Sequence, residues 1–320
     1  IVLVYVDSDT LKPVNYSTGA ELDIPLDEQS DAGVSTGRSY YGIKIGGGYG
    51  AGYEGSQVIY NSNTGYYYLF VSMGELNYEY RVGVGRASSI TGTYYDAGGK
   101  SMFLQKSDSS GDDYYSKYHA IGSKIIGAAA FDGEYSWRCP GGESILRTSD
   151  GKIMFACHSR TNFKAGYYFY LQLRQMFFTT DGWPILNQNE HYDDYDGSDE
   201  GLTALTAADI AGTYDTILTV RGTDTGSFTP YGGTAGTYNT ADETPTASVS
   251  MTLGSDGTIG GNTYGGTWTL GSDGYTVTMT LTEADGTALG TFKGYALKAT
   301  DWARKGSVTR QTISFTTIDS

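Results

Sequence analysis

The sequence predicts an all-β protein built from short antiparallel strands. Glycine (46 residues) and tyrosine (29) are abundant and proline (6) is scarce, a composition typical of many short strands joined by tight glycine turns. Segments rich in aromatic and aliphatic residues recur between turn-forming residues, and none carries a sustained helical period. The one short helical turn expected lies at 204–210. A chain of 320 residues can bury one or two substantial cores.

The first strand candidate is the apolar run IVLVYV at residues 1–6, which begins without a preceding turn or cap. The run is too short for a secretory signal peptide and is followed at once by Asp7, so no signal peptide is expected within these residues. Residues 7–44 are mostly polar loop. A possible short strand at 40–45 leads into a glycine-rich stretch.

That stretch brings Glu54 to a position immediately before two strand candidates, 57–60 and 66–71. Glycine tolerates positive φ and close approach of other groups, so a carboxylate between glycines can sit at the rim of a sheet and point at a ligand. A catalytic or ligand-binding acid needs this placement. The alternative is that Glu54 is a solvated loop charge.

An internal repeat supports the strand assignments. The segment TGYYYLFVSMG at 64–74 is followed by a strand candidate at 80–86, and DGKIMFACHSR at 150–160 is followed by one at 167–178. The offset from 64 to 150 is about twice the 40–45 residues of a four-stranded propeller blade. The repeat is the pattern expected if equivalent hairpins recur two blades apart.

A domain boundary is expected near the acidic run DDYDGSDEG at 193–201, which divides the chain into 1–200 and 201–320. Two later connections share the sequence GSDG, which predicts tight hairpin turns in which Asp tolerates the left-handed conformation and Gly supplies positive φ. Strands at this spacing close most economically into a small antiparallel barrel. The strand candidates of this second part are 213–220, 247–253, 267–270, 275–281, 287–296 and 310–317.

The net charge of −15 argues against nucleic acid or an anionic membrane as partner, since a polyanion would be repelled. The sequence contains no run of about 18 apolar residues, so no transmembrane helix is expected. The charge is compatible with a neutral polysaccharide, and tyrosine rings can stack on sugars, although most tyrosines are expected to be half-buried strand residues. Cys139 and Cys157 are expected to be free thiols, because one pair in so long a chain is weak evidence for an oxidising compartment.

The stretch GGGYGAGYEG, with VIYN and TGYYYLFVS after it, resembles the loop and strand pair that presents the general acid in arabinanases of glycoside hydrolase family 43. Glu54 matches that acid, while Ser56 and Thr93 stand where the family usually has proline. The resemblance implies a partial five-bladed β-propeller at 1–200 and an accessory β-barrel at 201–320. It continues through 80–94, 122–131, 139–160 and 176–184 and so covers most of residues 1–195.

The resemblance implies an extracellular enzyme that hydrolyses α-1,5-linked L-arabinofuranosyl bonds in plant cell-wall arabinan or arabino-oligosaccharides, with inversion. Inversion needs a base about 6.5–9.5 Å from the acid, and the acid's pKa must be raised. The family's base and pKa-tuning aspartates lie upstream of the matched region. Asp7, Asp9, Asp23 and Asp27 fall near the start of the chain but stand in no matching motif.

About three of the five blades are therefore expected here, and roughly two blades with the base and the tuner would lie on upstream sequence. The N-terminal portion of the same enzyme, as a second chain, is the expected partner. Two alternatives stay open, a non-catalytic carbohydrate-binding propeller fragment and a purely structural fragment.

The resemblance also implies a metal ion, Ca²⁺ or Na⁺, near the propeller axis. Related arabinanases use a histidine in a PGHNS-type motif, but the corresponding run here is CPGGES, residues 139–144, without the histidine. Glu143 can offer an oxygen ligand, or it is a solvated glutamate. His158 matches an H-S-R motif of the family and is expected near the ion or as a satisfied strand histidine. One histidine without a second His or Cys at ligand spacing does not make a zinc site.

Overall fold

The computed structural model describes residues 1–15, 18–21, 43–48, 52–74, 80–103, 121–131, 136–161, 169–191, 201–218, 246–301 and 310–319. Regular structure in these residues is almost entirely β-strand, as predicted. The chain divides into two compact units, and each is described by itself. The first comprises 1–73, 84–123 and 221–235, and the second comprises 74–83, 124–220 and 236–320.

The first unit begins with two short antiparallel pairs where a single strand was predicted. β1 (Val2–Leu3) pairs with β4 (Ile43–Lys44), and β2 (Tyr5–Val6) pairs with β3 (Pro13–Val14). The two halves of the apolar run 1–6 thus have different partners. Tyr5 and Val6 are 46% and 55% exposed, so this half does not enter a core.

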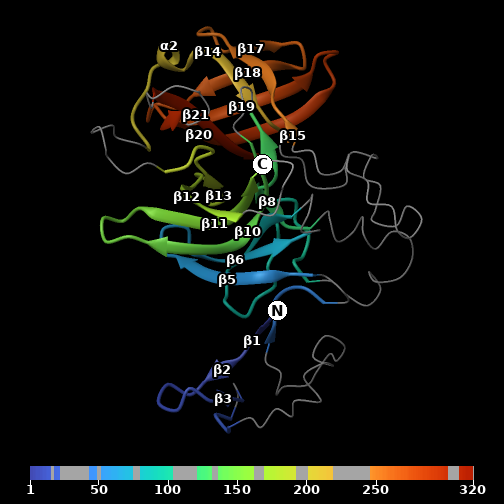
Figure 1. The fold of residues 1–320 in the computed structure, drawn as a ribbon, viewed down its shortest axis with the longest axis vertical. Coiled ribbons are helices and arrows are strands. Elements are labelled where there is room, and N and C mark those ends of the chain that lie inside the picture. The colour runs from blue at the N-terminus through green and yellow to red at the C-terminus, as the bar shows by residue number, and fades with distance from the viewer. Residues whose placement is uncertain are drawn as a thin grey trace, which may run out of the picture. The chain divides into compact units, whose positions relative to one another are not determined.

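A four-stranded sheet follows along the chain, with the order β5-β6-β7-β8, and Figure 1 shows β5 and β6 side by side. Its strands are β5 (Glu54–Asn61), β6 (Tyr66–Met73), β7 (Arg81–Ala87) and β8 (Ser123–Ile126). β6 is the apolar centre of the first unit, because Leu69, Val71 and Met73 are fully buried. The same core contains Ile45, Ala87, Tyr94, Met102 and Ile121.

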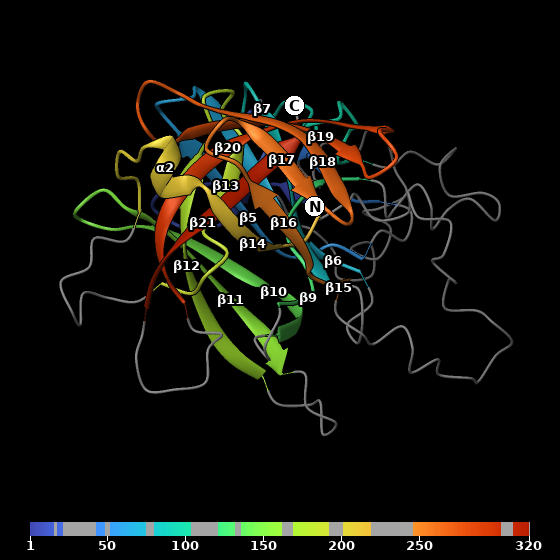
Figure 2. The ribbon, with the colours of Figure 1, turned by 90° about the horizontal axis from the view of Figure 1, so that it is seen from above.

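The second unit contains a six-stranded sheet of order β13-β12-β11-β10-β9-β15, of which Figure 2 shows β12, β11, β10 and β9 side by side. Five neighbouring pairs are involved, and only β15 runs parallel to its neighbour. The strands are β9 (Ala129–Ala130), β10 (Ser136–Arg147), β11 (Ile153–Thr161), β12 (Phe169–Phe178), β13 (Pro184–Leu186) and β15 (Thr246–Ala247). The strand predicted after each copy of the internal repeat is present: β7 follows the first copy and β12 follows the second.

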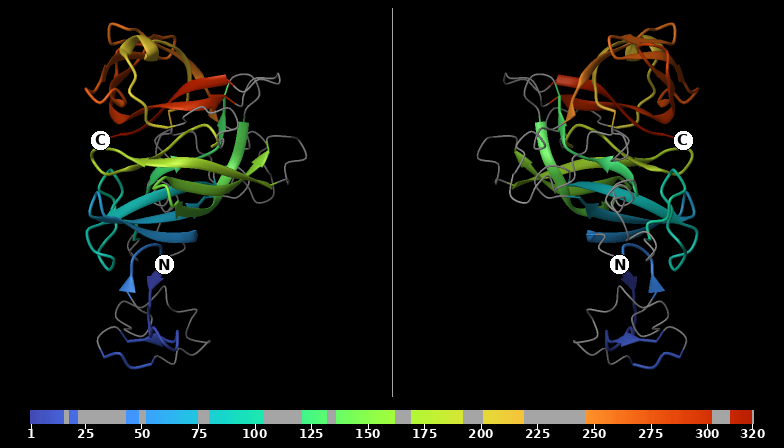
Figure 3. Two further views of the ribbon diagram at one scale, coloured as in Figure 1. Left: turned by 90° about the vertical axis from the view of Figure 1, so that its left-hand side faces the viewer. Right: turned by 90° about the vertical axis from the view of Figure 1, so that its right-hand side faces the viewer.

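A seven-stranded antiparallel sheet completes the second unit, in the order β14-β16-β17-β18-β19-β20-β21. The rings of Tyr214 in the first strand and Phe315 in the last lie 4.8 Å apart, so the sheet curls until its edge strands meet (Figure 3). The predicted barrel is confirmed, and β17 is a strand that was not predicted. The strands are β14 (Gly212–Thr216), β16 (Val249–Leu253), β17 (Thr258–Gly261), β18 (Tyr264–Leu270), β19 (Thr276–Glu283), β20 (Ala288–Asp301) and β21 (Arg310–Asp319).

The two GSDG segments form the expected turns, with Gly257 at φ +87° and Gly274 at φ +78°. The expected role of the aspartates is corrected, because neither has a positive φ. Asp256 instead accepts hydrogen bonds from the backbone and hydroxyl of Thr258. Asp273 does the same for Thr276, so each carboxylate holds its turn through hydrogen bonds.

The helical turn expected at 204–210 is α2 (Ala207–Ile210). Thr206 caps it: the Thr206 hydroxyl accepts from the Asp209 N–H, and the Asp209 carboxylate accepts from the Thr206 N–H at 2.8 Å. No helix among the described residues is long and apolar enough to cross a membrane. The linker expected at 193–201 lies outside the described residues apart from Gly201, so the boundary near 200 stays a prediction.

Candidate functional site

Glu54 is the first residue of β5 and lies opposite Ser72 of β6. The pairing shifts register between Glu54 and Gln57, and Gly55 within the shift has φ +56°. This is a β-bulge, which bends a strand and redirects the side chains beside it. The strand thus begins three residues earlier than the predicted 57, and the acid belongs to the sheet rather than to the glycine-rich loop.

The positive φ at position 55 explains why a glycine follows the acid. Its left-handed backbone conformation costs other L-residues roughly 1–2 kcal/mol. The Glu54 side chain is exposed at the end of the strand, where a ligand can reach it from solvent. This position is compatible with the predicted acid role.

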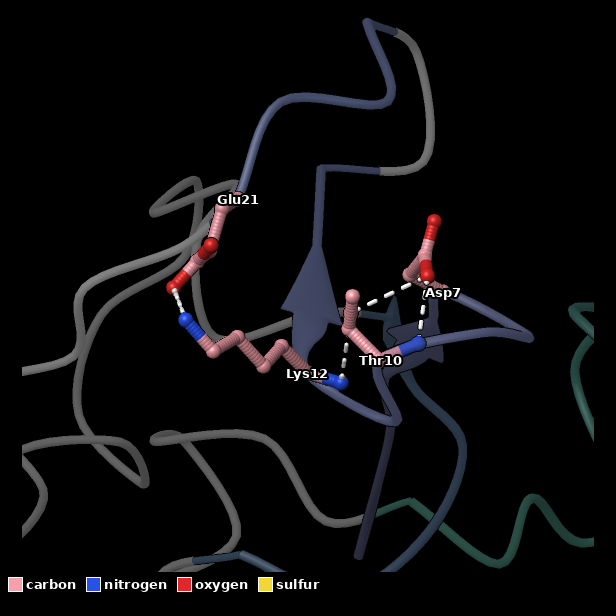
Figure 4. Close-up of polar contacts among 4 residues, drawn as sticks. All are labelled: Asp7, Thr10, Lys12 and Glu21. Carbon is pink, nitrogen blue, oxygen red and sulfur yellow. Dashed lines mark hydrogen bonds and ion pairs between the residues drawn. The ribbon is translucent and has the colours of Figure 1, made fainter.

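Of the aspartates near the start of the chain, Asp7 holds a local turn. The Asp7 carboxylate accepts from the N–H of Asp9 at 3.0 Å. It also accepts from the N–H (2.8 Å) and the hydroxyl of Thr10 (Figure 4). The hydrogen bond from the Thr10 backbone is the main cause that lowers the pKa of Asp7. Asp7 therefore caps a turn.

Asp23 and Asp27 lie outside the described residues. Beyond the same turn, Lys12 and Glu21 form an exposed ion pair of 2.7 Å (Figure 4). One buried carboxylate was missed by the sequence analysis. Asp96 is 2% exposed and accepts from the N–H groups of Lys100 (2.8 Å) and Gly122 (3.1 Å), which makes it a link between two loops.

Glu143 lies in a doubly bulged part of β10. The pairing of β10 with β11 shifts between Arg138 and Gly141 and again between Gly141 and Ser144. Cys139 (φ +52°) and Gly142 (φ +60°) adopt left-handed conformations at these shifts. The Glu143 side chain is only 5% exposed, so the interpretation as a solvated glutamate is wrong.

His158 lies on β11 opposite Gly141, so the structure brings His158 and Glu143 to neighbouring positions of paired strands. Its ring stacks on Tyr80, with centroids 6.1 Å apart, and meets the edge of Phe169 at 5.2 Å. A Cβ at residue 142 would lie 2.7 Å from the His158 Nδ1. The glycine therefore lets the backbone approach the imidazole closely.

Glu54 lies in the first compact unit, whereas Glu143 and His158 lie in the second.

The donor set of this pair is one carboxylate and one imidazole. Among the described residues no group of three or more His, Cys, Asp or Glu side chains is placed to hold a metal ion. Ca²⁺ takes six to eight oxygen ligands, so Glu143 and His158 fit only a site in which water or backbone oxygens complete the coordination.

A polar row on β12 was also missed. The Arg174 side chain is fully buried, donates to Gln172 Oε1 at 3.0 Å and lies 4.5 Å above the Trp137 ring. It also donates to the carbonyl oxygens of Asn187 and Gln188. The alternation of Tyr, Gln and Arg along residues 170–174 was the available signal, because alternate residues of a strand share a face.

Cys139 and Cys157 are free thiols, as predicted, and both are buried. Burial is the main cause that raises the pKa of the Cys157 thiol to about 11, and the charges of Glu143 and Glu190 add to it. The Arg174 guanidinium acts in the opposite direction. Because the thiolate is the nucleophilic form, Cys157 is unsuited to nucleophilic chemistry near neutral pH.

Comparison with known proteins gives two adjoining matches. Residues 23–184 match the glycosyl hydrolases family 43, and residues 193–320 match the C-terminal lipocalin-like domain associated with it. The chain is 31% identical over 186 residues to the extracellular endo-alpha-(1->5)-L-arabinanase 2 of Bacillus subtilis, covering 55% of this chain and 38% of that protein. It is 30% identical over 156 residues to an extracellular endo-alpha-(1->5)-L-arabinanase of Thermotoga petrophila, covering 46% of this chain and 32% of that protein. The chain thus matches about a third of the length of these curated relatives.

Among solved structures, the Thermotoga petrophila endo-1,5-alpha-L-arabinanase in complex with TRIS is similar, with a TM-score of 0.67 and 25% identity. The superposition covers 99% of this chain and 66% of that chain. The predicted fold class, a partial five-bladed β-propeller followed by a small antiparallel barrel, is confirmed.

Proposed function

Because this chain belongs to glycoside hydrolase family 43, we propose that it is part of an enzyme that hydrolyses α-1,5-linked arabinan. The observation that carries the proposal is the position of Glu54, an exposed carboxylate beside a β-bulge, within the segment that matches the family. The names of the relatives, endo-alpha-(1->5)-L-arabinanases, support α-1,5-linked arabinan as the substrate.

Glu54 acts as the general acid that protonates the leaving glycosidic oxygen. The mechanism is inverting, with a base about 6.5–9.5 Å away that activates water on the opposite face of the sugar. Of the aspartates near the start of the chain, Asp7 is occupied as a turn cap. As the resemblance implies, the base and the pKa-tuning aspartate would come from upstream sequence or from a companion chain.

The experiment is hydrolysis of linear arabinan by the chain together with the part of the Thermotoga petrophila arabinanase that it does not match. Glu54→Gln should lower the rate at least ~100-fold, because general acid catalysis contributes roughly 10²–10⁴. Glu283→Gln, which changes an exposed glutamate of β19, is the matched control and should leave the rate unchanged. Unchanged turnover in Glu54→Gln would exclude the acid role.

A non-catalytic carbohydrate-binding protein is the second candidate, and it is favoured by the assignment of Asp7 to a turn rather than to catalysis. A binding protein needs platforms and hydrogen bonds but no base. Isothermal titration with arabino-oligosaccharides separates the two: binding without hydrolysis, in every combination with the unmatched part, supports this candidate.

The ion proposal concerns Glu143 and His158, with Ca²⁺ or Na⁺ as the ion. Support comes from the burial of Glu143 and from the ring contacts that orient His158. A ligand that binds only the folded state raises the melting temperature. Ca²⁺ should therefore stabilise the chain, and Glu143→Gln should abolish that increment; a Ca²⁺ response that survives in the variant would place the ion elsewhere.

Secretion is also proposed, because both curated relatives are named extracellular. Fractionation of the producing cells tests it, and recovery of the protein only inside the cells would exclude it.

A further inference from the structure

Four side chains from neighbouring strands form a row on one face of the four-stranded sheet in the first unit. Tyr66 begins β6, and the guanidinium carbon of Arg86 on β7 lies 4.4 Å from the centre of the Tyr66 ring. Arg86 is directly opposite Tyr95, and Tyr95 is directly opposite Ser101. Residues opposite one another share a face of a sheet. We call Tyr66, Arg86, Tyr95 and Ser101 the tyrosine row.

The tyrosine row is held in place by contacts within the sheet. The backbones of Arg86 and Tyr95 exchange hydrogen bonds of 2.8 and 2.9 Å. The Arg86 side chain also donates a hydrogen bond to the Tyr68 hydroxyl, and that hydroxyl donates to Thr64 Oγ1 at 2.8 Å. A site whose groups are already fixed loses little conformational entropy when a ligand binds.

Solvent reaches the tyrosine row. Tyr95 is 49% exposed, and the other three members are partly exposed. A ligand in solution can therefore contact the Tyr95 ring without any rearrangement of the sheet.

The tyrosine row is separate from the proposed general acid. Glu54 lies opposite Ser72, which is six residues further along β6 than Tyr66. A strand rises about 3.3 Å per residue, so the row lies roughly 20 Å along the strand from the acid. Between them, Tyr68 and Phe70 on the same side of β6 are fully buried. The two exposed regions are therefore distinct sites on one sheet.

The chemistry of the tyrosine row suits a sugar chain. An aromatic ring packs on the C–H face of a sugar, and the Arg86 guanidinium offers planar donors for sugar hydroxyls. The Ser101 hydroxyl accepts from the Phe103 N–H at 3.1 Å and so keeps its own proton to donate. Neighbouring strands lie about 4.8 Å apart, so the row is roughly 14 Å long, which fits an oligosaccharide better than one sugar.

We propose that the tyrosine row is a second carbohydrate-binding site, which holds a neutral arabinan chain away from Glu54. The ligand class rests on the proposed function, whereas binding at the row does not require catalysis by Glu54. The net charge of −15 disfavours a polyanionic chain. Two sites on one molecule raise its affinity for a polymer that spans both, because the second contact becomes intramolecular.

The first test measures how strongly α-1,5-linked arabinan in a native gel retards the full chain. Tyr95→Ala should weaken the affinity about fivefold or more, whereas Tyr95→Phe keeps the ring and should bind like the parent. Tyr60→Ala is the matched control, because Tyr60 is a 53% exposed tyrosine of the same sheet. It pairs with Tyr67, the neighbour of Tyr66, and so lies on the opposite face. Circular dichroism shows whether each variant is folded.

A second measurement reports on the site directly and does not depend on removing a ring. Tyr95→Trp keeps an aromatic surface, and its emission should shift to the blue when arabino-oligosaccharides cover it. Tyr60→Trp should give no shift. The parent chain, with its four native tryptophans, supplies the background signal.

Four results would overturn the proposal. These are no retardation of the parent chain by arabinan, equal retardation of Tyr95→Ala and Tyr60→Ala, no response of Tyr95→Trp, and stronger retardation by polygalacturonate than by arabinan. The last result would make Arg86 the centre of a site for acidic sugars. Hydrolysis by the completed enzyme and its loss in Glu54→Gln are measured separately, so a failure here is distinguishable from a failure of the proposed arabinanase activity.

Discussion

The Tyr295 hydroxyl donates a hydrogen bond of 2.7 Å to the carbonyl oxygen of Phe178, and so joins β20 of the barrel to the end of β12. Around it, Phe177, Ile185 and Leu297 form a small buried cluster with the Tyr295 ring. An ion pair of 2.8 Å between Lys293 and Asp181 lies nearby in solvent. The barrel and the six-stranded sheet therefore share a core as well as a polar contact.

Tyr295→Phe should lower the free energy of unfolding by about 1 kcal/mol. The substitution keeps the ring in its cluster but removes the hydroxyl, and a typical hydrogen bond contributes about 0.5–1.5 kcal/mol. Urea denaturation measures the change. Lys293→Ala is the comparison, and because both partners of its ion pair are more than a third exposed, it should cost about 0.5 kcal/mol or less. Equal losses would mean that the hydroxyl adds nothing specific.

Arg174→Met should destabilise the second unit by about 2–3 kcal/mol. Methionine keeps much of the apolar stem, but the Gln172 side chain and the carbonyls of Asn187 and Gln188 lose their buried donor. Arg147→Met, at an exposed arginine of β10, is the matched control and should change stability little. A neutral Arg174→Met would show that the buried guanidinium can be replaced by apolar packing, as happens for some buried ion pairs.

The location of strands could be predicted wherever local residues determine them. The barrel strands other than β17 and their GSDG turns, the hairpins of the repeat and the helical turn at α2 all follow from turn chemistry and strand composition within a few residues. The resemblance of residues 46–55 to a family motif also placed Glu54 beside a strand. Its bulge depends on one positive φ at Gly55 and on pairing with β6, which no local pattern specifies.

The orientation of β12 could not be predicted for a different reason. Its alternation of leucine with polar residues assigns the leucines to a core, but Trp137 and Asn187, which are distant in sequence, stabilise the polar side instead. The burial of Glu143 likewise depends on two register shifts in β10, and in the sequence only Pro140, Gly141 and Gly142 suggest them. Tertiary contacts determine both features.

Stability should fall above pH 9 because of Cys157. Burial raises its pKa to about 11 from an ordinary 9.0, so the unfolded chain loses the thiol proton first. The stabilisation by the protonated thiol is complete below pH 9 and is lost as the pH rises through about 11. Between pH 8 and pH 10 the loss should be about 1 kcal/mol.

Urea titrations of the parent chain and Cys157→Ala at these two pH values measure the contribution of the thiol. Cys157→Ala should make the free energy of unfolding depend less on pH. This holds even if the substitution itself changes the stability. Several tyrosines also have raised pKa values, about 12 for Tyr94, Tyr170 and Tyr214, and their contribution is lost at higher pH. If the free energy of unfolding falls equally in both proteins between pH 8 and pH 10, the loss comes from other groups.

Gly142→Ala should disturb the surroundings of His158 in a way that a simple backbone strain would not. The new Cβ would lie 2.7 Å from the imidazole Nδ1, so the ring must leave its place between Tyr80 and Phe169. Gly65→Ala is the matched control, since Gly65 has φ +74° but nothing within 4 Å of a Cβ. Both variants carry the left-handed strain of roughly 1–2 kcal/mol, and only Gly142→Ala adds the clash.

Nuclear magnetic resonance of the imidazole protons should show a shift in Gly142→Ala and none in Gly65→Ala. If the two variants have equal stability and an unchanged imidazole signal, the close approach of residue 142 does not position the ring.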